Sequence, residues 1–146
     1  MFDEEETHLA LRAVLESVAE LPQTRAWQSV EVKPSATVDY VGDELSLGGS
    51  TVISGPAQHG TIEQEGEYIV LVVCRQGRGN AGVRVITSSV LAAFPPGLAI
   101  ALPSGARLHI ATNPAPRPGD TENDGTRQRK EVFIPWFVHS INTLSS

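Results

Sequence analysis

The sequence predicts an α+β fold in which two helices pack on a mainly antiparallel sheet of about five or six strands. An amphipathic pattern opens the chain, a second one follows a glycine-rich turn, and alternating or β-branched segments fill much of the rest. The 146 residues are 40% hydrophobic and 19% charged, which suits one domain with a sizeable core. We find no internal repeat and no domain boundary, so residues 1–146 are read as a single domain.

The first helix is predicted to run from about Asp3 to Leu21. Asp3 can cap it, Glu6 is placed to complete a capping box, and Pro22 ends it. Apolar side chains recur every three or four residues along one face, at Leu11, Val14, Leu15, Val18 and Leu21.

The middle of the chain contains the strongest strand signal, at residues 67–74. These residues are apolar on both alternations, which predicts a central strand covered on both faces. Before it, alternation at residues 30–32 and 38–40, around Pro34, predicts one or two short strands. Glycines and serines interrupt residues 42–60, which we interpret as a long loop or a projecting hairpin.

The second helix is predicted at residues 83–94, with Asn80 available near its N-cap and prolines after it. Strands at 98–102 and 107–112 then form a plausible hairpin. Residues 113–126 are rich in proline and glycine and are predicted to form a long loop. A final strand is expected at 128–139, at an edge or a bulge because it contains Pro135.

Charge is unevenly distributed along the chain. Net charge is −6, but residues 1–67 hold 13 acids and 3 bases, whereas residues 68–146 hold 4 acids and 8 bases. Without a dense basic cluster, strong duplex DNA binding is not expected. Surfaces of opposite sign could meet head to tail, as in rings, or the fold could scatter these charges.

Few features of the sequence bear on the cellular compartment of the protein. Cys74 is the only cysteine, so no internal disulfide can form and synthesis in a reducing cytosol is expected. Residues 1–6 are acidic where a secretory signal would be basic, and no apolar run approaches the ~20 residues that span a membrane. We therefore expect neither a secretory signal nor a membrane-spanning helix.

The motif Gly77-x-Gly79-x-x-Gly82 matches a dinucleotide-binding fingerprint between a predicted strand and a predicted helix. That chemistry needs an acid about 20 residues further on to bind the ribose. No Asp or Glu occurs between Glu67 and Asp120, so we favour a flexible turn into a capped helix. A nucleotide-binding enzyme that uses residues 77–82 stays an alternative.

Other potential sites are weak, and we predict no enzyme, no catalytic residue, no metal and no cofactor. The four histidines lack a metal-binding spacing. Cys74 is expected to be buried and inert, and Trp27 and Trp136 to anchor the core. Arg127, Arg129 and Lys130 form the only tight basic group, either a solvated loop edge or a rim that contacts a partner subunit or DNA phosphates. These three are our candidate interface residues.

The chain resembles the tail terminator (tail completion, minor tail) proteins of long-tailed bacteriophages. Nearly the whole chain carries the resemblance, at the opening helix ending in Leu21-Pro22, at 26–30, at 60–73, at the glycine-rich turn and helix ending in Phe94-Pro95, and at 132–137. Residues 42–60 and 113–126 are long for this family.

The resemblance implies a virion component near the head–tail junction, synthesised in the bacterial host cytoplasm. Such a subunit forms a ring homo-oligomer, commonly a hexamer, on the last ring of the tail tube. The ring ends tube polymerisation and offers a surface to the head–neck connector, and DNA passes through it only as cargo. Its implied partners are thus itself, the tail tube protein and the connector, with no membrane. A neck or head-completion protein is the nearest alternative.

Overall fold

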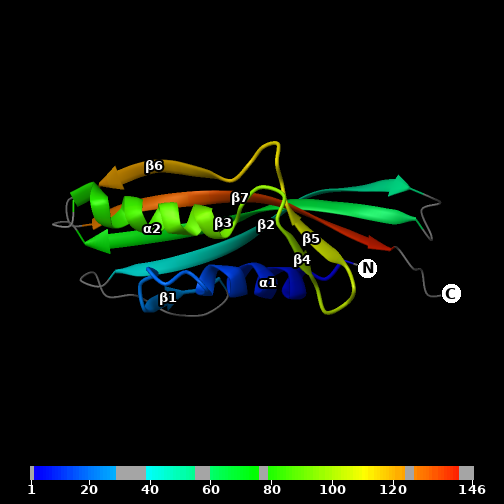
Figure 1. Cartoon of the computed structure of the whole chain (residues 1–146), viewed down its shortest axis with the longest axis horizontal. Coiled ribbons are helices and arrows are strands. Elements are labelled where there is room, and N and C mark those ends of the chain that lie inside the picture. Colours follow the sequence, from blue (N-terminus) through cyan, green and yellow to red (C-terminus); the bar gives the residue numbers. More distant parts are fainter. Residues whose placement is uncertain (1, 29–38, 55–59, 76–78, 124–126, 142–146) are drawn as a thin grey trace.

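In the computed structural model the chain is a mixed α+β fold dominated by one curled sheet (Figure 1). The structure describes residues 2–28, 39–54, 60–75, 79–123 and 127–141. The elements in chain order are α1 (Glu4–Glu16), β1 (Thr24–Ala26), β2 (Tyr40–Ser54), β3 (Thr61–Arg75), α2 (Gly79–Ala93), β4 (Ala99–Ala101), β5 (Arg107–Ile110), β6 (Arg117–Asn123) and β7 (Arg127–Ile141). The α+β class is confirmed, but the described residues form a seven-stranded sheet that dominates the fold, rather than two helices packed on five or six strands.

The three long strands form the centre of the sheet, in the order β1-β2-β3-β7-β5-β4. Among the described strands, only β1 and β2 pair in parallel. β3 pairs with β7 along its full length, whereas the other edge of β7 holds β6 beside residues 128–133 and β5 beside residues 136–139. The strand predicted to be central is therefore central, and it extends at both ends beyond the predicted 67–74.

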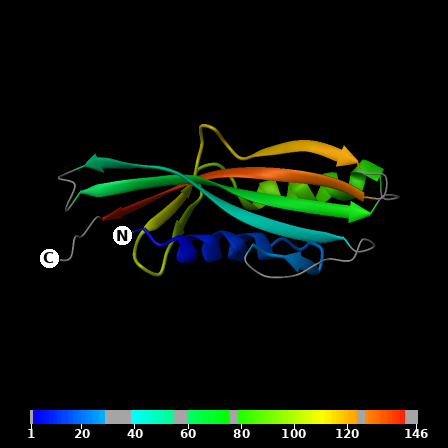
Figure 2. The same cartoon turned by 180° about the vertical axis from the view of Figure 1, so that it is seen from behind.

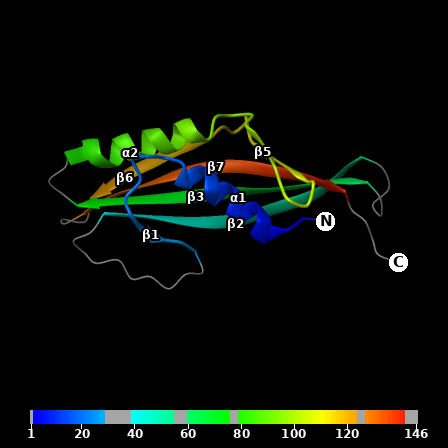
Figure 3. The same cartoon turned by 60° about the horizontal axis from the view of Figure 1, so that its bottom comes forward.

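Side chains from both helices join the strands in one apolar core on a single side of the sheet, here called the core face. Figure 3 shows α1 and α2 together on that side. The predicted face of the second helix is confirmed, because Val83, Ile86, Val90 and Phe94 are all buried. Neither helix, within the part of the chain that the structure describes, is long and apolar enough to cross a membrane.

The first helix ends at Glu16, not at Leu21 as predicted. Both the backbone N–H and the hydroxyl of Ser17 donate to the Val14 carbonyl, which closes the last turn. Val18 and Leu21 nevertheless remain buried in the core from the turn that follows, so their apolar spacing reflects burial beyond the helix.

The cap of α1 forms as predicted, but the full capping box does not. Asp3 Oδ1 accepts a 3.1 Å hydrogen bond from the Glu6 N–H. The Glu6 carboxylate instead accepts from the backbone N–H of Ser104 at 2.6 Å and from its hydroxyl at 2.8 Å. Ser104 lies between β4 and β5, so Glu6 joins the start of the helix to the predicted hairpin, which is confirmed.

Both regions predicted as long loops contain strands. Of the two interpretations of residues 42–60, the hairpin is correct, because β2 runs to Ser54 and pairs with β3 through an irregularity at residues 48–49. In 113–126, β6 pairs with β7, and a register shift between Pro118 and Thr121 accommodates the intervening residues. Backbone groups on the edge of β7 pair with those of β6, which the local composition of 113–126 did not predict. The strand predicted at residues 30–32 lies outside the described residues, and of the one predicted at 38–40, Tyr40 is the first residue of β2.

Pro135 lies inside the sheet without interrupting it. β7 changes neighbour at this point, since Phe133 pairs with β6 and Trp136 pairs with β5. The Pro135 carbonyl accepts from Ala111 N–H on that same side. Because the nitrogen and carbonyl of one strand residue point the same way, the missing N–H faces the gap between β6 and β5. The final strand was predicted to lie at an edge or a bulge because of Pro135. The gap beside Pro135 agrees with that prediction, but β7 as a whole lies inside the sheet.

The prediction that residues 67–74 would be covered on both faces holds only in part, because Val73 is buried on the side opposite Tyr68 whereas Ile69 and Leu71 are not. Tyr68, Val70 and Val72 point to the core face and are fully buried. Ile69 and Leu71 point to the opposite side, here called the open face, and are only half-buried. Figure 2 shows β2, β3 and β7 from that side with neither helix in front of them.

Candidate functional site

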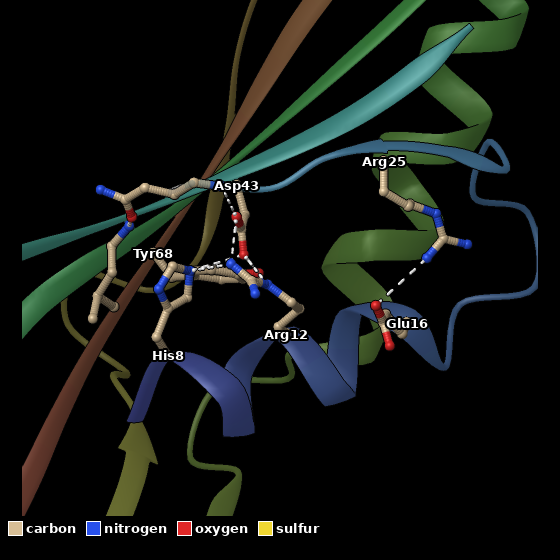
Figure 4. A network of polar contacts seen from close by, with 8 residues as sticks. His8, Arg12, Glu16, Arg25, Asp43 and Tyr68 are labelled. Atoms are coloured by element: carbon tan, nitrogen blue, oxygen red, sulfur yellow. Dashed lines mark hydrogen bonds and ion pairs between the residues drawn. The ribbon is translucent and has the colours of Figure 1, made fainter. Parts of the chain in front are cut away.

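A buried carboxylate, Asp43 of β2, is the centre of a polar network between α1 and the sheet (Figure 4). Its Oδ2 accepts hydrogen bonds from the Tyr68 hydroxyl at 2.7 Å and from Arg12 Nε at 2.9 Å, and His8 Nε2 lies 2.9 Å away. Its Oδ1 accepts from Arg12 Nη2 at 3.1 Å and from the Gln28 N–H at 2.9 Å. The carboxylate therefore links β2 to β3, to α1 and to the segment that follows β1.

Asp43 and Tyr68 of this network keep one ionisation state at neutral pH. Burial alone would raise the pKa of Asp43, but hydrogen bonds from His8, Arg12, Gln28 and Tyr68 outweigh it and hold that pKa well below its ordinary value. Burial, reinforced by the Asp43 charge, raises the pKa of Tyr68 above its ordinary value. General acid–base catalysis needs a pKa near the working pH, so Asp43 and Tyr68 suit a structural role.

Trp27 extends the network to the surface. The guanidinium carbon of Arg12 lies 5.0 Å from its ring centroid and that of Arg25 lies 5.7 Å away. Trp27 is half-buried and packs against the core, whereas Trp136 is fully buried within it. The prediction that both tryptophans anchor the core is thus confirmed for Trp136 and holds in part for Trp27.

The structure separates the predicted interface residues. They lie at the start of β7, where strand alternation places Arg127 and Arg129 on the open face and Lys130 on the core face. Arg129 Nε lies 3.8 Å from Glu122 Oε2, and Lys130 Nζ lies 3.3 Å from the Thr121 hydroxyl. These residues form no common basic patch.

The strands of the acidic half and those of the basic half of the sequence lie on opposite sides of β3. β3 contains the boundary between them and lies between β2 from the first half and β7 from the second. The first-half strands β1 and β2 are therefore separated by β3 from the second-half strands β4, β5, β6 and β7, and the meeting of surfaces of opposite sign stays a prediction.

The glycine motif lies at the start of α2, with residues 76–78 outside the described part of the chain. The dinucleotide-binding unit requires a strand, a helix and a second strand parallel to the first. The strand after α2 is β4, which is separated from β3 by β7 and β5 and runs antiparallel to β3. The motif therefore lacks its expected structural context.

Two of the four histidines lie side by side on the open face, which the sequence did not indicate. The ring centroids of His109 and His139 are 5.5 Å apart, and Phe137 stacks on His109 at 4.9 Å. Burial, then the nearby charges of His139 and Arg107, lower the pKa of His109. Across the described ranges, no group of three or more His, Cys, Asp or Glu side chains is arranged to hold a metal ion. Cys74 is buried, as predicted.

The open face also carries an apolar stripe. Ile69 and Leu71 on β3 lie opposite Phe133 and Glu131 on β7. Phe133 and Phe137 are half-buried on this face, and the Arg117 guanidinium covers the Phe133 ring at 5.0 Å. Large apolar side chains on an uncovered sheet face are typical of a surface that meets another protein.

A groove of about 560 Å³ hollows the same face, next to this stripe. Glu63, Glu65 and Glu67 of β3 line it together with Pro135 and Phe137 of β7. The alternation Glu63-x-Glu65-x-Glu67 is visible in the sequence and places three carboxylates on one face of a strand. This alternation is the one sequence feature that could have indicated the groove. The other residues that line the groove come from distant parts of the chain, such as Pro135 and Phe137 of β7.

Comparison with known proteins supports the fold alone. No family model and no curated protein matches the chain. One solved structure, whose name states no function, aligns with a TM-score of 0.70 and 17% sequence identity, covering 94% of this chain and 96% of that chain. The same α+β architecture thus exists in another protein with a very different sequence.

Proposed function

We propose that this chain is a phage structural assembly protein that caps the tail tube as a ring, ends tube polymerisation and provides the head–neck joining surface. The proposal begins from the resemblance described above to tail terminator proteins. The mixed α+β fold of the chain agrees with the α+β subunit that this resemblance implies.

The half-buried apolar stripe on the open face carries the proposal. Burial of apolar area is the main favourable term in protein association, at roughly 25 cal/mol per Å². Ile69, Leu71, Phe133 and Phe137 lie on a rigid central part of the sheet rather than on mobile loops. An extended surface of this kind favours protein assembly over the binding of a small substrate.

The polar network also favours assembly. Asp43 fixes α1 and β2 through buried hydrogen bonds, so the sheet is held from the core side without help from the open face. A subunit built in this way can present the open face to neighbours while its fold is maintained.

Sedimentation with tail tubes tests the proposal. The tubes are assembled from the tail tube protein encoded in the same genome, and the chain is added with and without them. We expect the chain to form a ring of about six subunits on tube ends, as expected for closed heterologous assembly. A strict monomer that neither binds tubes nor limits their length contradicts the proposal.

Matched variants locate the contact. Leu71→Gln changes the open face, whereas Val85→Gln changes an apolar side chain that is 55% exposed on α2. We expect Leu71→Gln to lose tube binding and Val85→Gln to keep it, with thermal unfolding confirming that both are folded. Parallel pull-downs with purified heads and purified tails distinguish the terminator from the alternative neck protein, which would bind heads first.

A further inference from the structure

The acidic groove adjoins an unpaired strand edge. β1 pairs only with residues 40–42 of β2, and Gln28 Oε1 accepts from the Leu45 N–H at 2.7 Å. From Ser46 to Val52, no described strand pairs with the outer edge of β2. Backbone N–H and C=O groups along this edge are therefore available to an added strand.

This edge lacks the side chains that usually prevent strand addition. Residues 46–52 include no charged residue and no proline. Leu47 and Val52 are each 45% exposed. Natural edge strands are commonly protected by charges, prolines or bulges, and here only the irregularity at Gly48 and Gly49 interrupts the edge.

The two glycines open a path from the edge to the groove. A Cβ atom at Gly48 would lie 3.4 Å from Cγ of Glu65, and one at Gly49 would lie 3.8 Å from Oε1 of Glu65. The Gln64 amide donates to both glycine carbonyls, at 3.0 and 3.4 Å, and holds the irregularity in place. The Glu65 carboxylate therefore lies beside the edge with no side chain between them.

The groove has unbalanced negative charge. Glu63 Oε1 lies 2.9 Å from His139 Nε2, and Glu67 Oε2 lies 3.4 Å from Arg117 Nη1. No described residue forms an ion pair or hydrogen bond with the Glu65 carboxylate, which lies between these two pairs. Such a groove repels phosphates and attracts cations, while Pro135 and Phe137 offer apolar surface to the stem of a long side chain.

We infer that the β2 edge and this groove together bind an extended segment of another protein that carries lysine or arginine on alternating residues. The segment pairs with residues 46–52, and a basic side chain reaches over Gly48 and Gly49 to Glu65. The tight basic group at 127–130 of a second copy is not the occupant, because both edges of that segment are already paired, with β3 and with β6. The inference rests on the proposed function in one respect, which is that the partner is expected to be another protein of the same phage particle.

A peptide titration followed by ¹⁵N NMR tests this inference on the full chain. The probe is a blocked ten-residue peptide of alternating lysine and threonine, and its control has glutamate in place of lysine. We expect saturable shifts at Ser46, Gly48 and Glu65 with the lysine peptide and none with the control. Added salt should weaken binding, because exposed charges are screened over about 10 Å at 0.1 M.

Charge variants make the test specific. Glu65→Gln should weaken binding about two- to fivefold, as expected for one exposed ion pair, and Glu65→Lys should weaken it further. The control is Glu122→Gln, which changes an acidic residue of β6 that lies beside Arg129 of β7. This variant should leave binding unchanged. Absence of shifts with the lysine peptide, or equal binding by wild type and Glu65→Lys, overturns the inference. Neither result bears on tube capping, which the tube experiment measures independently.

Discussion

The hydroxyl of Tyr68 donates a 2.7 Å hydrogen bond to Oδ2 of Asp43, and this bond joins two neighbouring strands inside the protein. The two residues are not direct partners, since Asp43 lies opposite Val70 and Tyr68 lies opposite Leu45. Their bond is thus diagonal across the ladder, on the core face. The same carboxylate also binds Arg12, so one buried charge helps to position α1.

Replacing Asp43 by Asn should strongly destabilise the protein. The amide keeps the shape but leaves the Arg12 guanidinium without its counter-charge, and breaking a buried pair costs about 3–5 kcal/mol. Urea unfolding measures the free energy of unfolding directly. Glu122→Gln removes an exposed partner of Arg129 and should cost less than about 1 kcal/mol. A loss below that level for Asp43→Asn would show that the network is dispensable.

Tyr68 should make the protein sensitive to alkali. Its pKa is raised above the ordinary 10.0, so above pH 10.0 the unfolded chain releases the phenol proton while the folded chain retains it. Tyr68 therefore stabilises the folded protein below pH 10.0. This contribution is lost progressively as the pH rises from 10.0 toward the higher pKa of the folded state. Urea midpoints between about pH 8 and about pH 11 should fall in the wild type and fall less in Tyr68→Phe. Equal slopes in the two proteins would refute this assignment.

The pKa of His109 should lie below its ordinary 6.5, because burial, His139 and Arg107 all disfavour the imidazolium. As pH falls below 6.5, the unfolded chain binds this proton before the folded chain does, so His109 lowers stability in acid. NMR titration of the His109 ring measures the value. In His139→Asn the pKa should rise, because one positive neighbour is removed, yet stay below 6.5 because burial remains. An unchanged value would exclude the His139 contribution.

Gly66 should not tolerate a side chain. A Cβ atom there would lie 2.5 Å from the Trp136 ring and would also collide with the Ser46 carbonyl. Gly66→Ala should therefore lower the free energy of unfolding by about 1–3 kcal/mol, the usual cost of overpacking. Gly49→Ala is the matched control, because its Cβ atom would meet nothing closer than 3.8 Å. Thermal unfolding compares the two, and equal melting temperatures would contradict the packing.

The sequence predicted the parts of the fold that depend on local pattern. The periodicity of Leu11 and Leu15, the cap at Asp3 and the β-branched run at 67–74 each specify an element through neighbouring residues. The strand β6 was missed and β2 was only one of two alternatives, because the prolines near β6 and the glycines Gly48 and Gly49 in β2 favour loops locally. Their pairing with β3 and β7 outweighs that preference.

The candidate site was less predictable than the fold. Asp43 binds residues 15 to 35 positions away, and neither Arg12 nor Tyr68 is marked by sequence as its partner. The basic group at 127–130 attracted attention because its residues are consecutive, yet strand alternation divides it between two faces. Glu63, Glu65 and Glu67, spaced by two, share one face instead. Which face of the sheet remained open depended on where the helices packed.

Tube length measured by electron microscopy is the most direct test of the proposal that this chain caps the tail tube through its open face. The tail tube protein is polymerised with increasing amounts of wild type, Leu71→Gln or Val85→Gln. The account predicts that wild type and Val85→Gln shorten the tubes in proportion to their concentration and form a ring at one tube end, whereas Leu71→Gln does neither. Tubes of equal length with all three proteins and with none would contradict it.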